Sequence, residues 1–113
     1  MSRNYVMYLQ DILDCIENIK EYTDGFDFYK YNSSSIVQDA VERSLEIIGE
    51  AVKKVPLEIR DRYYQVEWRK IAGFRDILIH EYSYIQTDIV WDVVENKLDE
   101  LEEHIKEIIQ CES

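Results

Sequence analysis

The chain has 113 residues, of which 46% are hydrophobic and 33% are charged, and its formal net charge at pH 7 is −11. This size predicts one domain over residues 1–113 with a single modest core. No apolar run approaches the roughly 18 residues of a membrane span, and the first residues lack the apolar segment of a signal peptide. We therefore expect a cytoplasmic protein. Its two cysteines, Cys15 and Cys111, lack metal-ligand spacing and are expected to stay reduced.

Apolar residues recur at spacings of three and four along most of the chain, which is the pattern of amphipathic helices. The first helix is predicted over about residues 4–22. A short aromatic connector follows over residues 26–31, and candidate N-caps at residues 32–35 begin a second helix that Pro56 ends. Within this helix Gly49 costs roughly 1 kcal/mol relative to alanine. We therefore expect another helix to approach closely at Gly49.

The second half of the chain predicts three more helical segments. These are a short or irregular helix over residues 57–65, a helix from residue 67 to about residue 82, and a last helix from Thr87 or Asp88 to about Gln110. No segment alternates apolar and polar residues convincingly, and only three glycines and one proline interrupt the chain. The sequence thus predicts an all-α fold, an up-and-down four-helix bundle with an extra short helix.

The basic residues are unevenly distributed along this acidic chain. Residues 53–75 hold seven basic and three acidic residues, a balance of +4, whereas the remainder holds six basic and 21 acidic residues, a balance of −15. The overall charge disfavours general nucleic-acid binding, because phosphate contacts normally come from a basic face. One positive cleft could still bind an RNA strand with weak, salt-sensitive affinity. The alternative is that these residues are solvated side chains clustered by accident.

Three polar side chains that could take part in catalysis lie in one otherwise apolar helical segment: Arg75, His80 and Tyr82. A histidine transfers protons near neutral pH, an arginine holds a phosphate and stabilises its developing charge, and a tyrosine hydroxyl can position RNA or be modified. Together they suffice to cut RNA without a metal or another cofactor. The spacing alone is weak evidence, because a lone histidine in an apolar helix is more often a structural residue.

The surroundings of this segment resemble a known family. Residues 68–82, the following Ile89-Val90-Trp91 and the upstream run over residues 45–51 (LEIIGEA) resemble the HepT-like proteins of the HEPN superfamily. The resemblance covers nearly the whole chain. Two positions depart from the family pattern: Phe74 stands where methionine is frequent, and Gln86 where aspartate is common. The resemblance implies a ribonuclease that is the toxin of a type VII toxin–antitoxin pair.

The resemblance also implies roles for individual residues. Arg75 and His80 would be the catalytic pair, Asp76 the polar residue that often follows the arginine, and Tyr82 the target of AMPylation by the antitoxin, the nucleotidyltransferase MntA. Asp76 could equally make an ordinary helix ion pair. The implied partners are an RNA substrate and this antitoxin, without DNA, a membrane or a metal. From their place in an apolar pattern, two further charged residues receive a supporting role: Arg43 and Glu46.

An ideal helix places Arg75 and His80 about 140° apart around its axis, so the pair shares no face. The helix could end or distort near His80, the arginine could reach around it, or Arg75 of one subunit could act with His80 of another. The resemblance favours the third arrangement, a two-fold homodimer with the motif helices across a cleft. An acidic surface leaves room for a higher assembly with the antitoxin.

The expected reaction is attack of an RNA 2′-hydroxyl on the neighbouring phosphate. His80 transfers protons and Arg75 stabilises the phosphoryl charge, which predicts 2′,3′-cyclic phosphate ends and no cleavage of DNA. Two alternatives remain: a non-catalytic helical subunit that presents substrate to a separate nucleotidyltransferase, and a purely structural dimerisation domain. We expect no catalytic role for three other residues: His104 should lie on the acidic surface, and Trp68 and Trp91 in the core or an interface.

Overall fold

The computed structural model describes residues 4–80 and 87–113. Within those ranges the chain forms helices and no strand, which confirms the predicted all-α fold. The helices are α1 (Asn4–Tyr22), α2 (Phe28–Asn32), α3 (Ser35–Lys54), α4 (Leu57–Arg62), α5 (Trp68–His80), α6 (Thr87–Asn96) and α7 (Leu98–Glu112). In the part of the chain that is described, none of them is long and apolar enough to cross a membrane.

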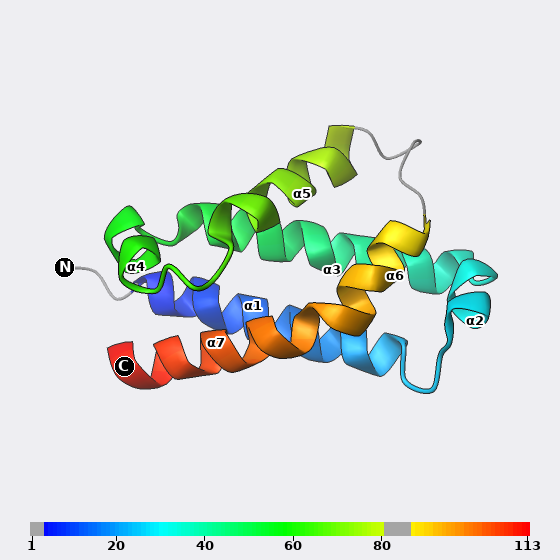
Figure 1. Ribbon diagram of the computed structural model, residues 1–113, viewed down its shortest axis with the longest axis horizontal. Helices are drawn as coiled ribbons and strands as arrows, with labels where there is room; N and C mark the ends of the chain where they lie inside the picture. Colours follow the sequence, from blue (N-terminus) through cyan, green and yellow to red (C-terminus); the bar gives the residue numbers. More distant parts are fainter. Residues whose placement is uncertain (1–3, 81–86) are drawn as a thin grey trace.

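Four of these helices, α1, α3, α5 and α7, form the bundle (Figure 1). α3 packs against both α1 and α5, and α7 packs along α1. The chain runs in one direction through α1 and α5 and in the opposite direction through α3 and α7. Figure 1 also shows α5 rising away from α3 toward its C-terminal end. The last turn of α5 therefore projects from the body of the bundle.

The core is built from the apolar stripes of α1, α3 and α7. Side chains three and four residues apart on each helix point inward and are almost completely buried: Leu9, Ile12, Ile16 and Ile19 on α1, Val41, Ile48 and Val52 on α3, and Ile105 and Ile108 on α7. Burial of such side chains contributes about 1.5–3 kcal/mol each relative to exposure. The periodic pattern of these three helices thus corresponds to their packing.

The predicted connector over residues 26–31 is partly helical, because residues 28–32 form α2. Asp27 caps this helix by accepting a hydrogen bond from the Lys30 backbone N–H at 2.8 Å. Tyr31 is fully buried, and its ring centroid lies 5.1 Å from that of Trp91. The single turn of helix thus directs an aromatic ring into the core, which a run of six residues is too short to indicate.

The predicted last helix is wrong in one respect, because it is two helices that meet at Lys97. Trp91 on α6 packs against Tyr31, whereas α7 packs along α1. Figure 1 shows α6 crossing the bundle before α7 turns to run beside α1. The change of direction lets α6 pack against α2 while α7 follows α1, and both Trp91 and Leu98 are buried.

Candidate active site

The motif lies on α5, a continuous helix through His80. Tyr82, the predicted modification target, lies outside the described residues, as do the predicted end of the motif helix and Gln86. The structure therefore places Arg75, Asp76 and His80 on α5, and Arg43 and Glu46 on the neighbouring α3.

Arg75 packs across Gly49 where α5 meets α3. A Cβ added to Gly49 would lie 2.1 Å from the Arg75 Cβ and 2.7 Å from its Cγ. The first separation is far below van der Waals contact, so only glycine admits the arginine stem at this point. The predicted close approach of a second helix at Gly49 is confirmed, and the group that uses the space is the candidate catalytic arginine.

A short polar chain orients the end of Arg75. Its Nη1 lies 3.3 Å from the Asp76 Oδ1, and the same oxygen accepts a hydrogen bond from Lys53 Nζ at 2.6 Å. The hydrogen bond from Lys53 is the main cause that lowers the pKa of Asp76; desolvation is the second-largest effect and opposes it, and Arg75 lowers the pKa further. Asp76 is therefore a carboxylate at neutral pH and makes an ion pair on each side.

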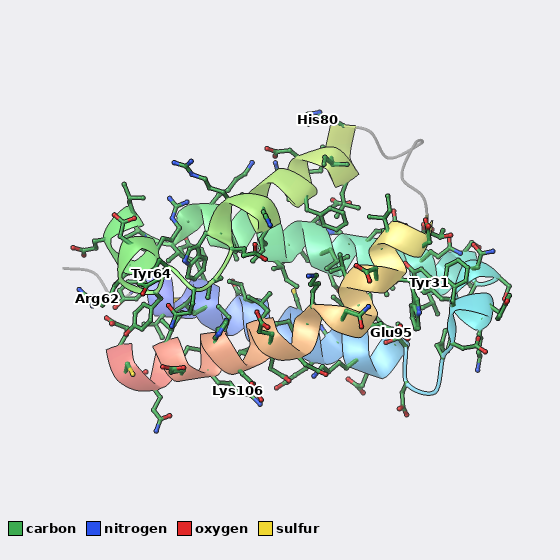
Figure 2. The ribbon with its side chains drawn as sticks, viewed as in Figure 1. Tyr31, Arg62, Tyr64, His80, Glu95 and Lys106 are labelled. Carbon is green, nitrogen blue, oxygen red and sulfur yellow. The ribbon has the colours of Figure 1, made fainter. Side chains whose placement is uncertain are left out.

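His80 is the last residue of α5 and is exposed. Figure 2 shows it at the end of the described part of this helix, directed away from the bundle. Its side chain makes no hydrogen bond or ion pair with another residue of the described ranges. The helix is regular up to His80, and the polar contact of Arg75 is Asp76. No hydrogen bond joins Arg75 to His80 in the described part of the chain, and the three arrangements expected for this pair stay predictions.

Arg43 and Glu46 form an ion pair on α3 at 3.5 Å, one turn apart, with Arg43 exposed and Glu46 largely covered. Glu46 precedes Gly49 by three residues and so lies one turn from the point where Arg75 packs. No ion pair joins Glu46 to Arg75 within the described part of the chain. The supporting role of these two residues stays a prediction.

Sequence reasoning missed two charged residues of α3, Lys53 and Glu42. Lys53 pairs with Asp76 across 23 positions of sequence, a separation at which spacing carries no signal. Glu42 has a raised pKa, first because it is half-buried and then because Asp39 and Glu46 repel its charge. The spacing of these three acids, three and four residues apart, was a visible signal of mutual repulsion on one helix face.

A second feature beside the motif helix is a cavity of about 300 Å³ between α5 and the α6–α7 region. Its lining is mainly apolar and includes Ile71 and Phe74 of α5 and Leu101 of α7. His104 was expected at the surface; it lies at this cavity and is half-buried. The reason is the direction of α7, which brings His104 to face α5.

Comparison with known proteins identifies a matching family and several relatives. The family model described as "Ribonuclease HepT-like" matches residues 12–108. The chain is 43% identical over 105 residues to "Putative RNase TTE0752" of Caldanaerobacter subterraneus subsp. tengcongensis, covering 93% of this chain and 94% of that protein. It is also 43% identical over 105 residues to "Putative RNase MJ0127" of Methanocaldococcus jannaschii, with 89% of this chain and 87% of that protein covered.

A third relative carries the family's own name. The chain is 37% identical over 101 residues to "Probable ribonuclease HepT" of Thermococcus cleftensis, covering 89% of this chain and 92% of that protein. No solved structure matches the chain significantly. The match over most of its length means that this chain belongs to the HepT-like ribonuclease family.

Proposed function

We propose that this chain is a metal-independent RNA endonuclease that acts as the toxin of a toxin–antitoxin pair. The observation that carries the proposal is the placement of Arg75 and His80 on α5 in a chain of the HepT-like ribonuclease family. Arg75 is held by Gly49 and Asp76, and His80 is free to reach a substrate. One group is preorganised to bind charge and the other is accessible to transfer a proton.

The proposed reaction uses a nucleophile that RNA itself supplies. The 2′-oxygen forms a bond to phosphorus while the bond from phosphorus to the 5′-oxygen breaks, which leaves a 2′,3′-cyclic phosphate and a 5′-hydroxyl. His80 mediates the transfer of the proton from the 2′-hydroxyl to the departing 5′-oxygen, a contribution of about 10²–10⁴-fold. Arg75 stabilises the negative charge on the phosphoryl oxygens. DNA lacks the hydroxyl and is not cut.

The proposed active form is an up-and-down bundle paired as a two-fold homodimer, in which Arg75 of one chain acts with His80 of the other. Two features of α5 support this arrangement. The helix is regular between the two residues, so they diverge within one chain. Ile77 and Ile79 between them are exposed, which leaves apolar surface beside the motif for a second copy.

The proposed off switch is AMPylation of Tyr82 by an MntA-like nucleotidyltransferase. Tyr82 follows His80 by two residues in the sequence. An added AMP would bring bulk and negative charge close to the proton-transfer group, and would repel the RNA backbone by the electrostatics through which phosphorylation acts. Modified protein is expected to lose cleavage while it remains folded.

The proposal is tested with purified protein whose intact mass shows no AMP. This protein and the variants His80→Ala and Arg75→Ala are incubated with total RNA in EDTA, and the ends of the fragments are sequenced. The expected result is cyclic phosphate ends from the unmodified protein alone, with each variant reduced by at least about 10²-fold. Wild-type cleavage by His80→Ala overturns the mechanism. If the wild-type protein is folded and unmodified but cuts no RNA, the ribonuclease proposal is wrong. The alternative of a non-catalytic substrate-binding subunit then remains.

A further inference from the structure

A second polar site lies where α4 turns into α5, at the opposite end of α5 from His80. A cavity of about 350 Å³ is formed there. We call this the α4–α5 corner and define it by four of its lining residues: Arg60, Tyr64, Arg69 and Lys70. Figure 2 shows Tyr64 beside α4, well separated from His80 at the far end of α5. Neither the motif nor the proposed catalytic step uses this corner.

Two arginines of the corner have side chains without a partner among the described residues. The side chains of Arg60 and Arg69 make no hydrogen bond or ion pair with any residue in the described ranges, and the Nε of Arg60 is buried without a partner there. Nearby cations differ, since Lys70 pairs with Glu67 at 2.7 Å and Arg62 with Glu112 at 2.8 Å. In a chain with 24 acidic and 13 basic residues, two unpaired guanidinium groups at one cavity are unexpected. A buried donor without a partner calls for a ligand acceptor.

The aromatic ring of the corner, that of Tyr64, is exposed. The Tyr64 side chain is 82% exposed. Its neighbours are used by the fold, because Tyr63 donates a hydrogen bond to Glu112 at 2.6 Å and the Trp68 Nε1 donates to the Tyr63 carbonyl at 3.1 Å. Trp68 is buried and forms part of the cavity wall. A rigid wall with a free ring and two free guanidinium groups provides an aromatic face next to phosphate donors.

We propose that the α4–α5 corner binds one nucleotide of a single-stranded RNA, with its base stacked on Tyr64 and its phosphate held by Arg60 and Arg69. An exposed ring stacks on unpaired bases, which duplex RNA does not offer. A guanidinium donates two parallel hydrogen bonds to a phosphate. This inference rests on the proposed function, because it supplies a second contact for the strand that the catalytic pair cuts.

The geometry of α5 sets the length of RNA that reaches both sites. Arg69 and His80 are eleven residues apart on a regular helix, which is about 16 Å along its axis. Stacked nucleotides rise about 3.4 Å each, so roughly five nucleotides separate the corner from His80. Substrates shorter than this cannot contact the corner and His80 of one chain together, and they should be insensitive to changes at the corner.

The test measures binding apart from cleavage. A fluorescein-labelled 12-nucleotide 2′-O-methyl RNA, whose blocked 2′-oxygen cannot attack, is titrated with the purified full chain and followed by fluorescence anisotropy. Tyr64→Ala is expected to weaken binding about 5-fold to 150-fold, the cost of one lost stacking contact. Tyr64→Phe keeps the ring and should bind like the wild type. An abasic oligonucleotide of the same length should bind as weakly to the wild type as the 2′-O-methyl RNA binds to Tyr64→Ala.

The arginines are tested by salt dependence. The double variant Arg60→Gln/Arg69→Gln should reduce the slope of log K against log salt by about 0.7, because the corner contacts one phosphate and each phosphate contact to a single strand contributes about 0.7. Two matched controls come from other parts of the surface. Tyr29→Ala removes a tyrosine that is 81% exposed on α2, and Lys106→Gln removes a cation from α7. Both should bind RNA like the wild type, and thermal unfolding should show all variants folded.

The outcomes separate this inference from the proposed function. Binding that depends on the corner in a protein that never cuts RNA supports the inference and overturns the ribonuclease. Normal cleavage of long RNA with corner variants that bind no worse than the two controls overturns the inference alone. Equal affinity of the wild type for the abasic oligonucleotide and the 2′-O-methyl RNA also overturns the inference. Displacement of the RNA by an equimolar poly-glutamate peptide overturns it too, and indicates that the corner binds acidic polypeptides.

Discussion

Gly49 and Arg75 occupy the same point of the α3–α5 contact, because a Cβ on Gly49 would lie 2.1 Å from the Arg75 Cβ. The glycine therefore sets how closely α5 can approach α3 and where the arginine stem lies. A structural glycine and a candidate catalytic arginine are in this way parts of one feature. A change at either residue should alter both the stability of the helix pair and the position of the guanidinium group.

Gly49→Ala should displace α5 and lower the free energy of unfolding by about 1–2 kcal/mol, since overpacking costs more than the gain in helix propensity. Urea denaturation measures this change. Gly73→Ala on α5 is the matched control, because a Cβ there meets no atom of the described residues beyond its own turn of helix within 4 Å. It should raise the free energy of unfolding by up to about 1 kcal/mol. Equal effects of the two substitutions would contradict the close packing at Gly49.

The ion pairs of Asp76 predict a dependence of stability on pH. Its folded pKa lies below the ordinary value of 3.8, mainly because of the hydrogen bond from Lys53. A lowered carboxyl pKa adds stability that is fully present above the unfolded pKa and is lost as the pH falls through the folded value. Wild type should therefore exceed Asp76→Asn in stability at pH 7, and the difference should shrink below about pH 4. A difference that does not change between pH 7 and pH 3 would refute this account.

Mixing two inactive variants tests whether the catalytic pair is shared between chains. Arg75→Ala and His80→Ala should each be inactive alone. In a two-fold dimer, half of randomly mixed pairs contain both variants, and each mixed pair has one site with both native residues, so about a quarter of wild-type activity should return. The chains are mixed in denaturant, refolded together and assayed for RNA cleavage. No recovery, with mixed dimers demonstrated by native mass spectrometry, would place both residues of a site in one chain.

Two tyrosines predict opposite effects of the same substitution. The Tyr31 hydroxyl is buried without a hydrogen-bond partner among the described residues, and burial raises its pKa. Tyr31→Phe should therefore raise the free energy of unfolding by up to about 1 kcal/mol. Tyr63 instead donates to Glu112, a bond that raises its pKa to about 12, so Tyr63→Phe should destabilise by about 1 kcal/mol. Chemical denaturation of both variants checks the sign, and two changes of the same sign would contradict the assignment.

Parts of the fold could be predicted from local sequence. The spacing of apolar residues on α1 and α3 predicted their buried faces, because a helix repeats every 3.6 residues whatever it packs against. The cost of glycine in a helix interior gave a reason to expect a close approach at Gly49. The break at Lys97 was not accessible, because residues 87–110 carry a periodic pattern without glycine or proline. The break appears only when Trp91 must reach Tyr31 while α7 follows α1.

Some features of the candidate site could likewise be predicted from the sequence, and others could not. The sequence by itself determined that Arg75 and His80 lie on one helix and diverge around it, because both facts follow from helix geometry over five residues. Only the tertiary structure decided that Arg75 fills the space above Gly49, that Lys53 holds Asp76, and that Arg60, Tyr64 and Arg69 meet at one corner. These contacts join α3 to α5 and α4 to α5, and periodicity within a helix carries no information about which residues of two helices meet. That choice depends on packing the whole core at once.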